Sequence, residues 1–362
     1  MTLAFHRLQI SDIQKETSDT ISLAFEIPQK LKNNYQFNSG QYLTLRTTID
    51  GEEIRRSYSL CSAPYENEWR VAIKKVKNGK FSDFANNTFK VGQELDVMTP
   101  TGHFQVHINE TNQKTYILFA AGSGITPIIS IIKSILKFEP KSNVMLFYGN
   151  KNSNSIIFKE QLEALKNEHM SNFRLVHIFS RETIGNQLQK GRINSEKCEQ
   201  LKNNFLKFEK DNIENCEVFI CGPEDMILAV KESMINFGIP PKQIHFELFG
   251  TNLIKIEKKE SKQDGEKEKI SSNVRIIIDG DALDINLDSD SDTILDAAHK
   301  AGADLPFSCK GGVCSTCKAK ILEGTVRMDI NYALEEDEIE AGFILTCQAH
   351  PTSEKLVLSF DE

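Results

Sequence analysis

The chain has 362 residues, of which 40% are hydrophobic, and a formal net charge of −8. This length predicts two or three domains, each with enough apolar residues to bury a core. It contains no apolar run of about 18 residues, which excludes a membrane-spanning helix, and no basic patch with interleaved aromatic residues, which excludes typical nucleic-acid binding. The N-terminal residues lack the pattern of a secretory signal, so we expect a cytoplasmic, reducing environment for the eight cysteines.

The first domain, expected over residues 1–110, begins as a series of short strands. Residues 21–28, 40–49, 55–64 and 69–77 are rich in β-forming residues and are bounded by Gly, Pro or Asn. Their regular spacing predicts an antiparallel β-barrel.

An R-S-Y-S-L run at residues 56–60 ends one of these strands. A flavin needs donors for its pyrophosphate, an aromatic ring over the isoalloxazine and a small hydroxyl near N5. Arg56, Tyr58 and Ser59 could provide these groups from the alternating positions of a strand. Taken alone, the same run is also typical of an ordinary exposed strand.

A second candidate flavin segment follows in the sequences VAIK, residues 71–74, and GKFS, beginning at Gly79. Gly79 provides a turn and Ser82 begins a helix, so that backbone amides and a hydroxyl can hold a phosphate. We assign Lys74, Gly79 and Ser82 to the cofactor site. A plain hairpin followed by a helix cap is the alternative.

From about residue 114 the pattern changes to alternating strands and helices, and we expect this second domain over residues 111–250. The helices are expected at 127–136 and 223–237. The expected strands are 115–121, 143–150, 173–180, 217–223 and 243–249. This order predicts a doubly wound parallel sheet.

The segment AAGSGITP, residues 120–127, lies between a strand and a helix, as a nucleotide-binding loop requires. Gly122 and Gly124 would allow nicotinamide and pyrophosphate to approach the backbone closely. The pattern is not G-x-G-x-x-G, and a glycine turn of any α/β unit is the alternative.

Two further strand ends are expected to face the same crevice. At Cys221, Gly222 and Pro223, the cysteine would lie beside the nicotinamide near the flavin N5, as a packing and polarising group rather than a nucleophile. At Ser180 and Arg181, a hydroxyl and a guanidinium could hold the 2′-phosphate of NADP. An ordinary exposed arginine is the alternative there.

Residues 251–272 are rich in Lys and Glu and predict a linker. Beyond it, over residues 273–362, we expect a β-grasp domain. Its helix is expected at 293–306, with Asp292 or Thr293 as N-cap. The expected strands are 274–280, 282–287, 318–324 and 355–360.

Four cysteines in this last domain have the spacing of a plant-type [2Fe–2S] ligand set. Cys309, Cys314 and Cys317 form a C-x4-C-x2-C run, and Cys347 follows alone. The glycines after Cys309 allow tight turns whose amides can point at sulfur. A zinc site is the alternative, although four-cysteine zinc sites usually contain two C-x2-C pairs.

The net charge is concentrated in the cysteine-rich domain. Residues 273–362 contain 7 Lys and Arg against 18 Asp and Glu, a balance of −11, whereas the rest of the chain has a balance of +3. This asymmetry indicates docking to a basic partner. A merely solubilising surface is an equal alternative.

With these motifs in order, the whole chain resembles the ferredoxin–NADP reductase superfamily fused to a plant-type ferredoxin. The segments RSYSL, GKFS, AAGSGITP, ICGPEDM and CKGGVCSTC carry the resemblance, which is greatest to the reductase subunits of phenylacetyl-CoA epoxidases. It implies a multidomain chain of α+β and α/β parts. It implies FAD rather than FMN, because of GKFS, and NADP(H) or NAD(H) as substrate.

The resemblance also implies roles for individual residues. Ser59 and Cys221 would be the catalytic residues. Phe249 would lie close to the flavin, next to the linker. Cys309, Cys314, Cys317 and Cys347 would hold the cluster. The implied FAD ligands are Arg56, Tyr58, Ser59 and Ser82, and the implied NADP(H) ligands are Gly122, Gly124, Thr126, Ser180, Arg181, Cys221, Gly222 and Pro223.

The implied activity is hydride transfer from NAD(P)H to the flavin, followed by single-electron transfer through the cluster to an oxygenase component. Three alternatives remain at this point. The acceptor could be another hydroxylase or a hybrid-cluster protein. The chain could be a non-enzymatic ferredoxin-type carrier with an inactive flavin domain. A haem-linked dioxygenase is disfavoured because no globin segment precedes the barrel.

Overall fold

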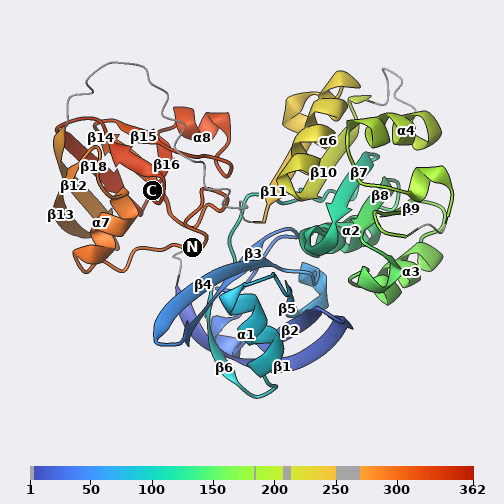
Figure 1. The fold of residues 1–362 in the computed structure, drawn as a ribbon, viewed down its shortest axis with the longest axis horizontal. Coiled ribbons are helices and arrows are strands. Elements are labelled where there is room, and N and C mark those ends of the chain that lie inside the picture. The colour runs from blue at the N-terminus through green and yellow to red at the C-terminus, as the bar shows by residue number, and fades with distance from the viewer. Residues whose placement is uncertain (1–3, 183–184, 207–212, 250–269) are drawn as a thin grey trace. The chain divides into compact units, whose positions relative to one another are not determined.

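A computed structural model gives the arrangement of residues 4–182, 185–206, 213–249 and 270–362. The chain divides into two compact units, Met1–Phe249 and Gly250–Glu362, and each is treated by itself (Figure 1). Residues 251–269, which are most of the expected linker, lie outside the described residues. The linker was expected to extend to residue 272, but Ser271 and Ser272 already belong to a strand. In the described parts of the chain, no helix is long and apolar enough to cross a membrane.

The first unit begins with a six-stranded antiparallel sheet that closes into a barrel, as predicted. Its order is β4-β3-β6-β1-β2-β5, and a bridge between Leu60 and Val71 joins the two outer strands. Leu23, Leu43, Val71 and Val97 are fully buried inside it. The elements are β1 (Phe5–Thr17), β2 (Thr20–Glu26), β3 (Tyr42–Ile49), β4 (Glu52–Ser59), β5 (Trp69–Lys74), α1 (Lys80–Thr88) and β6 (Glu94–Met98).

A five-stranded sheet follows in the same unit, in the order β11-β10-β7-β8-β9, and all its strand pairs are parallel. The first strand, β7, therefore lies between β8 and β10, and the chain progresses outward from it in both directions. Ligands of such sheets bind beyond the carboxyl ends of the strands at this switch point. The strands are β7 (Thr115–Ala121), β8 (Asn143–Asn150), β9 (Phe173–Phe179), β10 (Cys216–Gly222) and β11 (Ile244–Leu248).

Within the described residues of this domain, four helices accompany the sheet, which confirms the predicted doubly wound domain. Two of them, α3 and α4, were not predicted from the sequence. They are rich in charged residues and carry few buried side chains, so their apolar period is weak. The helices are α2 (Ile125–Phe138), α3 (Lys159–Glu168), α4 (Ser195–Phe205) and α6 (Glu224–Asn236).

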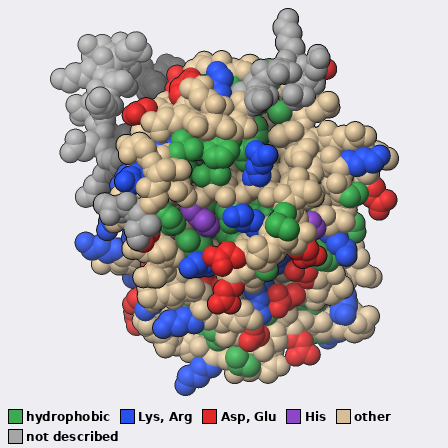
Figure 2. Space-filling model, turned by 90° about the vertical axis from the view of Figure 1, so that its right-hand side faces the viewer, with side chains coloured by type: hydrophobic (Ala, Val, Ile, Leu, Met, Phe, Trp, Pro, Cys, Tyr) green, Lys and Arg blue, Asp and Glu red, His purple; other side chains and the backbone are tan. Residues whose placement is uncertain are grey.

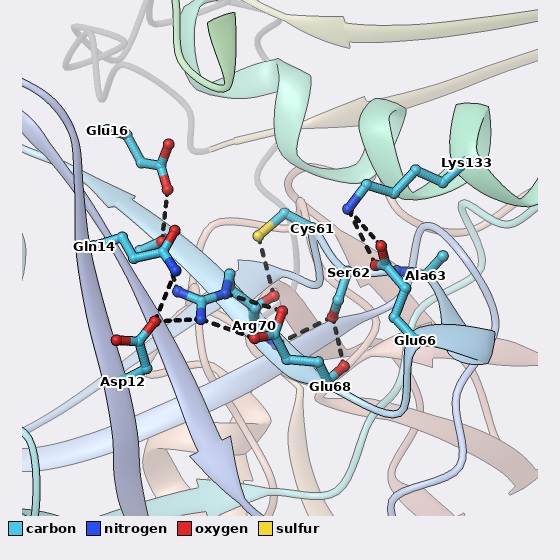
Figure 3. A network of polar contacts seen from close by, with 11 residues as sticks. Asp12, Gln14, Glu16, Cys61, Ser62, Ala63, Glu66, Glu68, Arg70 and Lys133 are labelled. Atoms are coloured by element: carbon cyan, nitrogen blue, oxygen red, sulfur yellow. Dashed lines mark hydrogen bonds and ion pairs between the residues drawn. The ribbon is translucent and has the colours of Figure 1, made fainter. Parts of the chain in front are cut away.

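Helix α2 connects the nucleotide-type sheet to the barrel through polar contacts. Ser130 Oγ donates to the carbonyl of Ser62 at 2.7 Å, and Lys133 Nζ lies 3.0 Å from Glu66 (Figure 3). On the same face, the hydroxyls of Ser134 and Ser39 lie 2.7 Å apart. These contacts fix the two sheets of the first unit relative to one another.

A second polar network stabilises the barrel wall below this contact (Figure 3). The guanidinium of Arg70 is only 6% exposed. It lies 2.8 Å from a carboxylate oxygen of Glu68 and 2.6 Å from one of Asp12, and it donates to Ser22 at 3.0 Å. The Ser22 hydroxyl in turn donates to Glu16 at 2.7 Å. A single buried cation thus ties β1, β2 and β5 together.

The second unit is a five-stranded sheet in the order β13-β12-β18-β14-β16, with a separate two-stranded pair of β15 and β17. The first two expected strands form a hairpin: β12 and β13 are antiparallel neighbours, and the turn between them places Asp279 and Gly280 at positive φ. The elements are β12 (Ser271–Ile278), β13 (Asp281–Asp288), α7 (Ile294–Lys300), β14 (Lys318–Glu323), β15 (Val326–Met328), α8 (Glu336–Glu340), β16 (Phe343–Leu345), β17 (Ala349–Pro351) and β18 (Lys355–Ser359).

Helix α7 is shorter than the expected 293–306. Thr293 is its N-cap, and its side chain accepts from the amide of Asp296 at 3.3 Å. Gly302 adopts a φ of +94°, and the amide of Ala303 donates back to Ala298 at 3.0 Å. Gly302 in the left-handed conformation therefore ends the helix, because the chain beyond it leaves the regular helical path.

Replacing Arg70 with alanine should lower the free energy of unfolding of the first unit by about 3 kcal/mol, because its carboxylate partners lose their cation. Trp69 is the only tryptophan of the chain, and it is 9% exposed in the barrel. Its fluorescence during urea unfolding therefore reports on this domain.

Arg7→Ala is the matched control for this prediction. Arg7 and its partner Glu94 have side chains that are 71% and 58% exposed, so the change should stay under about 0.5 kcal/mol. Equal losses in the two variants would contradict a structural role for the buried network.

Candidate functional site

Two chain segments meet so closely at the switch point that one of them needs glycine. A methyl group on Gly124 would lie 2.1 Å from the carbonyl oxygen of Cys221 and 2.9 Å from the backbone nitrogen of Gly222. A side chain there would push the turn after β7 away from the turn after β10. At Gly222 the nearest atom to an added methyl group is the flexible end of the Met226 side chain, at 2.6 Å, which can move. The structure thus brings the predicted Gly124, Cys221 and Gly222 together at the carboxyl edge of the sheet.

The turn into α2 is a short 3-10 helix, Gly122–Gly124, in which Gly122 has a φ of +54°. The Thr126 hydroxyl donates to the carbonyl of Ser123 at 3.1 Å, and the Tyr148 hydroxyl donates to that of Gly122 at 3.0 Å. These bonds fix the loop at the start of a helix, where backbone amides face outward and favour a negatively charged group.

A hydroxyl and a carboxyl face each other across the junction of the barrel and the parallel sheet. Ser59, at the end of β4, donates to Glu247 Oε2 of β11 at 3.1 Å. Glu247 pairs in register with Cys221 of the neighbouring strand. The structure therefore places the two predicted catalytic residues beside a third group, Glu247, which the sequence analysis missed. A carboxyl within the otherwise apolar FELF run was the available signal.

Burial determines the protonation of this group of residues. It raises the pKa of Glu247 to about 8, so the carboxyl holds its proton at neutral pH. It also raises the pKa of the Cys221 thiol well above its usual range. A fully buried, protonated thiol is a poor nucleophile, which favours the packing and polarising role predicted for Cys221.

The predicted pyrophosphate and isoalloxazine residues lie on one face of β4. Arg56 is exposed, and its Nη1 donates to the carbonyl of Arg55 at 2.7 Å. The Tyr58 ring lies 5.7 Å from that of Phe81 in α1, and burial raises the pKa of its hydroxyl. The side chains have the expected order along the strand.

The side chains around α1 that were predicted to bind the cofactor make ion pairs or hydrogen bonds with other residues of the protein. The Lys74 ammonium pairs with Asp19 at 3.2 Å. The Ser82 hydroxyl accepts from the amide of Val76 at 3.1 Å and lies only 2.6 Å from the place that a methyl group on Gly79 would occupy. Because these side chains already have partners, the groups left to bind a phosphate there are chiefly the backbone amides at the start of α1.

At the end of β9, Ser180 and Arg181 are exposed. The neighbouring Glu182 accepts from both the amide and the hydroxyl of Ser153, at 2.8 and 3.0 Å, so its negative charge is held by another loop. Pro223 is the N-cap of α6, and Phe249, 40% exposed, ends the described part of the first unit.

All four cysteines of the predicted cluster come together in the second unit. Cys314 and Cys309 have sulfurs 3.1 Å apart, and Cys347 lies within hydrogen-bonding reach of both Cys309 and Cys317. Hydrogen bonds from Cys314 and Cys347 hold the pKa of Cys309 well below its usual range. A [2Fe–2S] cluster is held by four such thiolates.

The cluster loop is shaped by backbone conformation. Gly312 has a φ of +70°, and a methyl group there would lie 2.8 Å from the carbonyl of Ile330. The amide of Gly311 donates to Cys309 Sγ at 3.3 Å. The sequence predicted that an amide of the glycine turn would point at a cysteine sulfur. Hydrogen bonds of this kind tune a cluster's reduction potential.

The fold and these sites define a class of oxidoreductase with a flavin barrel, a pyridine-nucleotide sheet and a [2Fe–2S] domain. Three family matches agree with this assignment. Residues 7–106 match the oxidoreductase FAD-binding domain, residues 118–232 the oxidoreductase NAD-binding domain, and residues 276–352 the 2Fe-2S iron-sulfur cluster binding domain. The predicted FAD, pyridine nucleotide and [2Fe–2S] cofactors are thereby confirmed.

Relatives match the chain over its whole length. It is 41% identical to a subunit of the 1,2-phenylacetyl-CoA epoxidase of Escherichia coli, over 99% of this chain and 98% of that protein. It is 30% identical to the 3-ketosteroid-9-alpha-monooxygenase ferredoxin reductase component of Rhodococcus rhodochrous, over 98% and 96%. The solved structure of phthalate dioxygenase reductase superposes with a TM-score of 0.60 at 24% identity, covering 99% and 98%.

The chain belongs to the ferredoxin–NADP reductase superfamily with a fused plant-type ferredoxin, in the family that contains this 1,2-phenylacetyl-CoA epoxidase component. The resemblance inferred from its motifs is confirmed.

Gly124→Ala should reduce NAD(P)H oxidation about a hundredfold, because displacing the loop by the order of 1 Å misplaces the substrate. Gly122→Ala is the comparison. No described atom lies within 4 Å of a methyl group there, so only the strain of its positive φ applies, about 1 kcal/mol. Steady-state rates of the two variants at equal flavin content would test this. A larger loss for Gly122→Ala would contradict it.

Glu247→Gln should flatten the pH dependence of stability. The pKa of Glu247 in the folded protein, about 8, lies above its ordinary value of 4.5. The stability that the protonated carboxyl contributes is therefore complete below pH 4.5 and is lost as the pH rises through 8. The glutamine variant should therefore lose less stability than the parent between about pH 5 and 8.5, as measured by urea unfolding.

Glu217→Gln is the matched comparison on the adjacent strand. Burial alone would raise the pKa of Glu217, but hydrogen bonds from His245 and Lys114 outweigh burial and lower it. Its stabilisation is therefore present at neutral pH and is lost on acidification. Identical pH profiles for the two variants would rule out the assigned protonation of Glu247.

Proposed function

We propose that this chain oxidises NADPH and passes the electrons, through FAD and its [2Fe–2S] cluster, to the oxygenase component of a phenylacetyl-CoA epoxidase. The observation that carries the proposal is the 41% identity to a phenylacetyl-CoA epoxidase component over 99% of the chain. The likeness extends over all three domains rather than over a single cofactor-binding module. The free, mostly buried cysteines suit a cytoplasmic location.

When bound, FAD accepts a hydride and releases electrons singly, which matches a two-electron donor to a one-electron cluster. The protein's own contribution is placement. The backbone around Gly124 and Gly222 admits the nucleotide close to the end of β4. Ser59 and Glu247 hold a hydrogen-bonded proton at the junction of the two sheets, and the fully buried Cys221 closes the crevice against water.

The charge distribution supports a separate docking role for the ferredoxin domain. Residues 273–362 carry a balance of −11, against +3 for the rest, whereas acidic and basic side chains are interspersed on the face drawn in Figure 2. A basic acceptor would be attracted to the cluster domain in preference to the reductase domains. A different oxygenase acceptor remains the second candidate, since related reductase components with 30% identity bear the name of a steroid monooxygenase.

Cys314→Ser tests the proposed order of electron transfer. Reduction of the flavin by NADPH should persist in stopped-flow absorbance, because the cluster lies after the flavin. Reduction of a one-electron protein acceptor should fall at least a hundredfold, while direct flavin turnover with ferricyanide remains. An unchanged rate to the protein acceptor would overturn the role of the cluster.

Reconstitution tests the acceptor. The wild-type chain, mixed with purified epoxidase oxygenase subunits and phenylacetyl-CoA, should support NADPH-dependent epoxide formation that weakens as salt is raised. The matched control replaces the epoxidase with a steroid monooxygenase oxygenase component and its own substrate. Higher turnover with the control would favour the second candidate.

A further inference from the structure

Glu139, the C-cap of α2, is a buried carboxyl surrounded by hydrogen-bond donors. Its side chain is 0% exposed. Oε1 accepts from the backbone amide of Asn109 at 3.0 Å and from Nδ2 of Asn112 at 2.8 Å. Oε2 accepts from the hydroxyls of Tyr116 and Ser142, both at 2.9 Å. One side chain thus joins the end of α2 to β7 and to the segment that precedes β7.

The kinds of donor indicate that this carboxyl is ionised. A backbone N–H and an amide nitrogen can only donate, so a proton on Oε1 would displace Asn109 and Asn112. Burial raises the pKa of the Tyr116 hydroxyl, which therefore keeps the proton that it donates. Hydrogen bonds to a charged acceptor are about twice as strong as those between neutral groups. The carboxylate of Glu139 is therefore a firm attachment with a defined geometry.

The segment that Glu139 holds is the connector between the barrel and the parallel sheet, residues 99–114, which lies between β6 and β7. Its first part is attached to the barrel. Tyr42 and Thr101 exchange backbone hydrogen bonds at 2.9 and 3.1 Å, and a methyl group on Gly40 would overlap the carbonyl oxygen of Phe104. Its last part is attached to the sheet through Glu139.

The middle of the connector has little support of its own. His107 and Ile108 line an open groove of about 510 Å³, together with Ser39 of the barrel and Ser134 of α2. Open space, rather than packed side chains, separates this part of the connector from the barrel. The position of the connector relative to α2 therefore depends on the attachment at Glu139.

Helix α2 transmits this attachment to the nucleotide loop. The helix has 14 residues, a length of about 21 Å. Glu139 holds its carboxyl end, whereas its amino end follows the loop Gly122–Gly124. A change in the tilt of α2 would move this loop relative to the barrel, which carries the flavin residues of β4.

The expected effect falls on the reaction rather than on binding. The nucleotide contacts move with the parallel sheet, and the flavin contacts move with the barrel, so each binding site stays intact when the junction loosens. Hydride transfer needs the reacting atoms of the two rings within about 3–3.5 Å of one another, and a misplacement of about 1 Å slows it strongly.

We propose that Glu139 is a positioning residue for hydride transfer, which holds the connector against the end of α2 and so fixes the angle between the nucleotide-binding sheet and the flavin barrel. Glu139 exchanges no proton or electron in that step. The inference rests on the proposed function in taking hydride transfer from a pyridine nucleotide to FAD as the reaction.

The test uses the full-length holoenzyme and the variant Glu139→Ala. At saturating NADPH, the limiting rate of flavin reduction in stopped-flow absorbance should fall by about tenfold or more. The dissociation constant of NADP⁺, measured by difference absorbance, should change by less than about twofold, because the nucleotide contacts remain. In hydrogen–deuterium exchange, residues 106–114 should exchange faster than in the wild type, because the amide of Asn109 loses its acceptor.

Three further variants complete the test. Glu139→Gln should keep the limiting rate within about threefold, because its oxygen still accepts from the connector and the two hydroxyls can turn to accept from its amide. Gln113→Ala removes an exposed amide of the same connector and should change neither rate nor exchange. Arg70→Ala destabilises the barrel away from the connector, and it should leave the limiting rate per bound flavin unchanged.

Four outcomes would count against these conclusions. If Glu139→Ala folds with normal flavin content and keeps the wild-type limiting rate, Glu139 does not position the domains. An equal fall in Arg70→Ala would refute the role as well, because general loss of stability would then explain the result. If Glu139→Ala does not fold, Asn112→Ala decides, and an unchanged rate with unchanged exchange refutes the inference. If neither NADPH nor NADH reduces the wild-type flavin, the proposed function fails instead.

Discussion

The close approach of Gly124 to the backbone of Cys221 and Gly222 is the constraint on which the first unit depends. It brings the start of α2 against the end of β10, so the two halves of the parallel sheet meet at one edge. The nucleotide loop, the buried thiol and the Ser59–Glu247 pair all take their places relative to this contact. A side chain at Gly124 would separate them, because the atoms that it would meet belong to the backbone of Cys221 and Gly222.

The cysteine loop of the second unit also depends on a glycine that lies close to another backbone segment. There too a glycine, Gly312, is required because another backbone segment passes close by. In the first unit the close approach packs the start of α2 directly against the backbone at the end of β10. In the second it turns the chain so that four thiols converge. Both sites are thus built mainly by backbone geometry, and their chemistry comes from bound groups.

The parts of this design that sequence could predict are those with a local signature. Cysteine spacing, glycine turns and apolar strands in alternation with helices indicated the three domains, the barrel and the parallel sheet. Strands β1 and β6 were missed because charged residues interrupt their alternation. Helices α3 and α4 were missed because few of their side chains are buried.

Long-range features left no such signature. Glu247 belongs to the site only because β11 pairs with β10, and its raised pKa depends on what surrounds it in space. In the sequence, a carboxyl within the apolar FELF run marks Glu247 as unusual, but it does not reveal that Ser59 and Cys221 are its neighbours.

Helix α2 joins the nucleotide loop at one end to the barrel along its length, through Ser130, Lys133 and Ser134. This has a consequence for the exchange of modules between related reductases. A chimaera cut between the two domains would leave α2 facing a foreign loop, and its buried hydroxyls would meet the wrong carbonyls. The natural unit of exchange therefore consists of α2 together with Ser39 and residues 62–66 of the barrel, a set that is discontinuous in the gene.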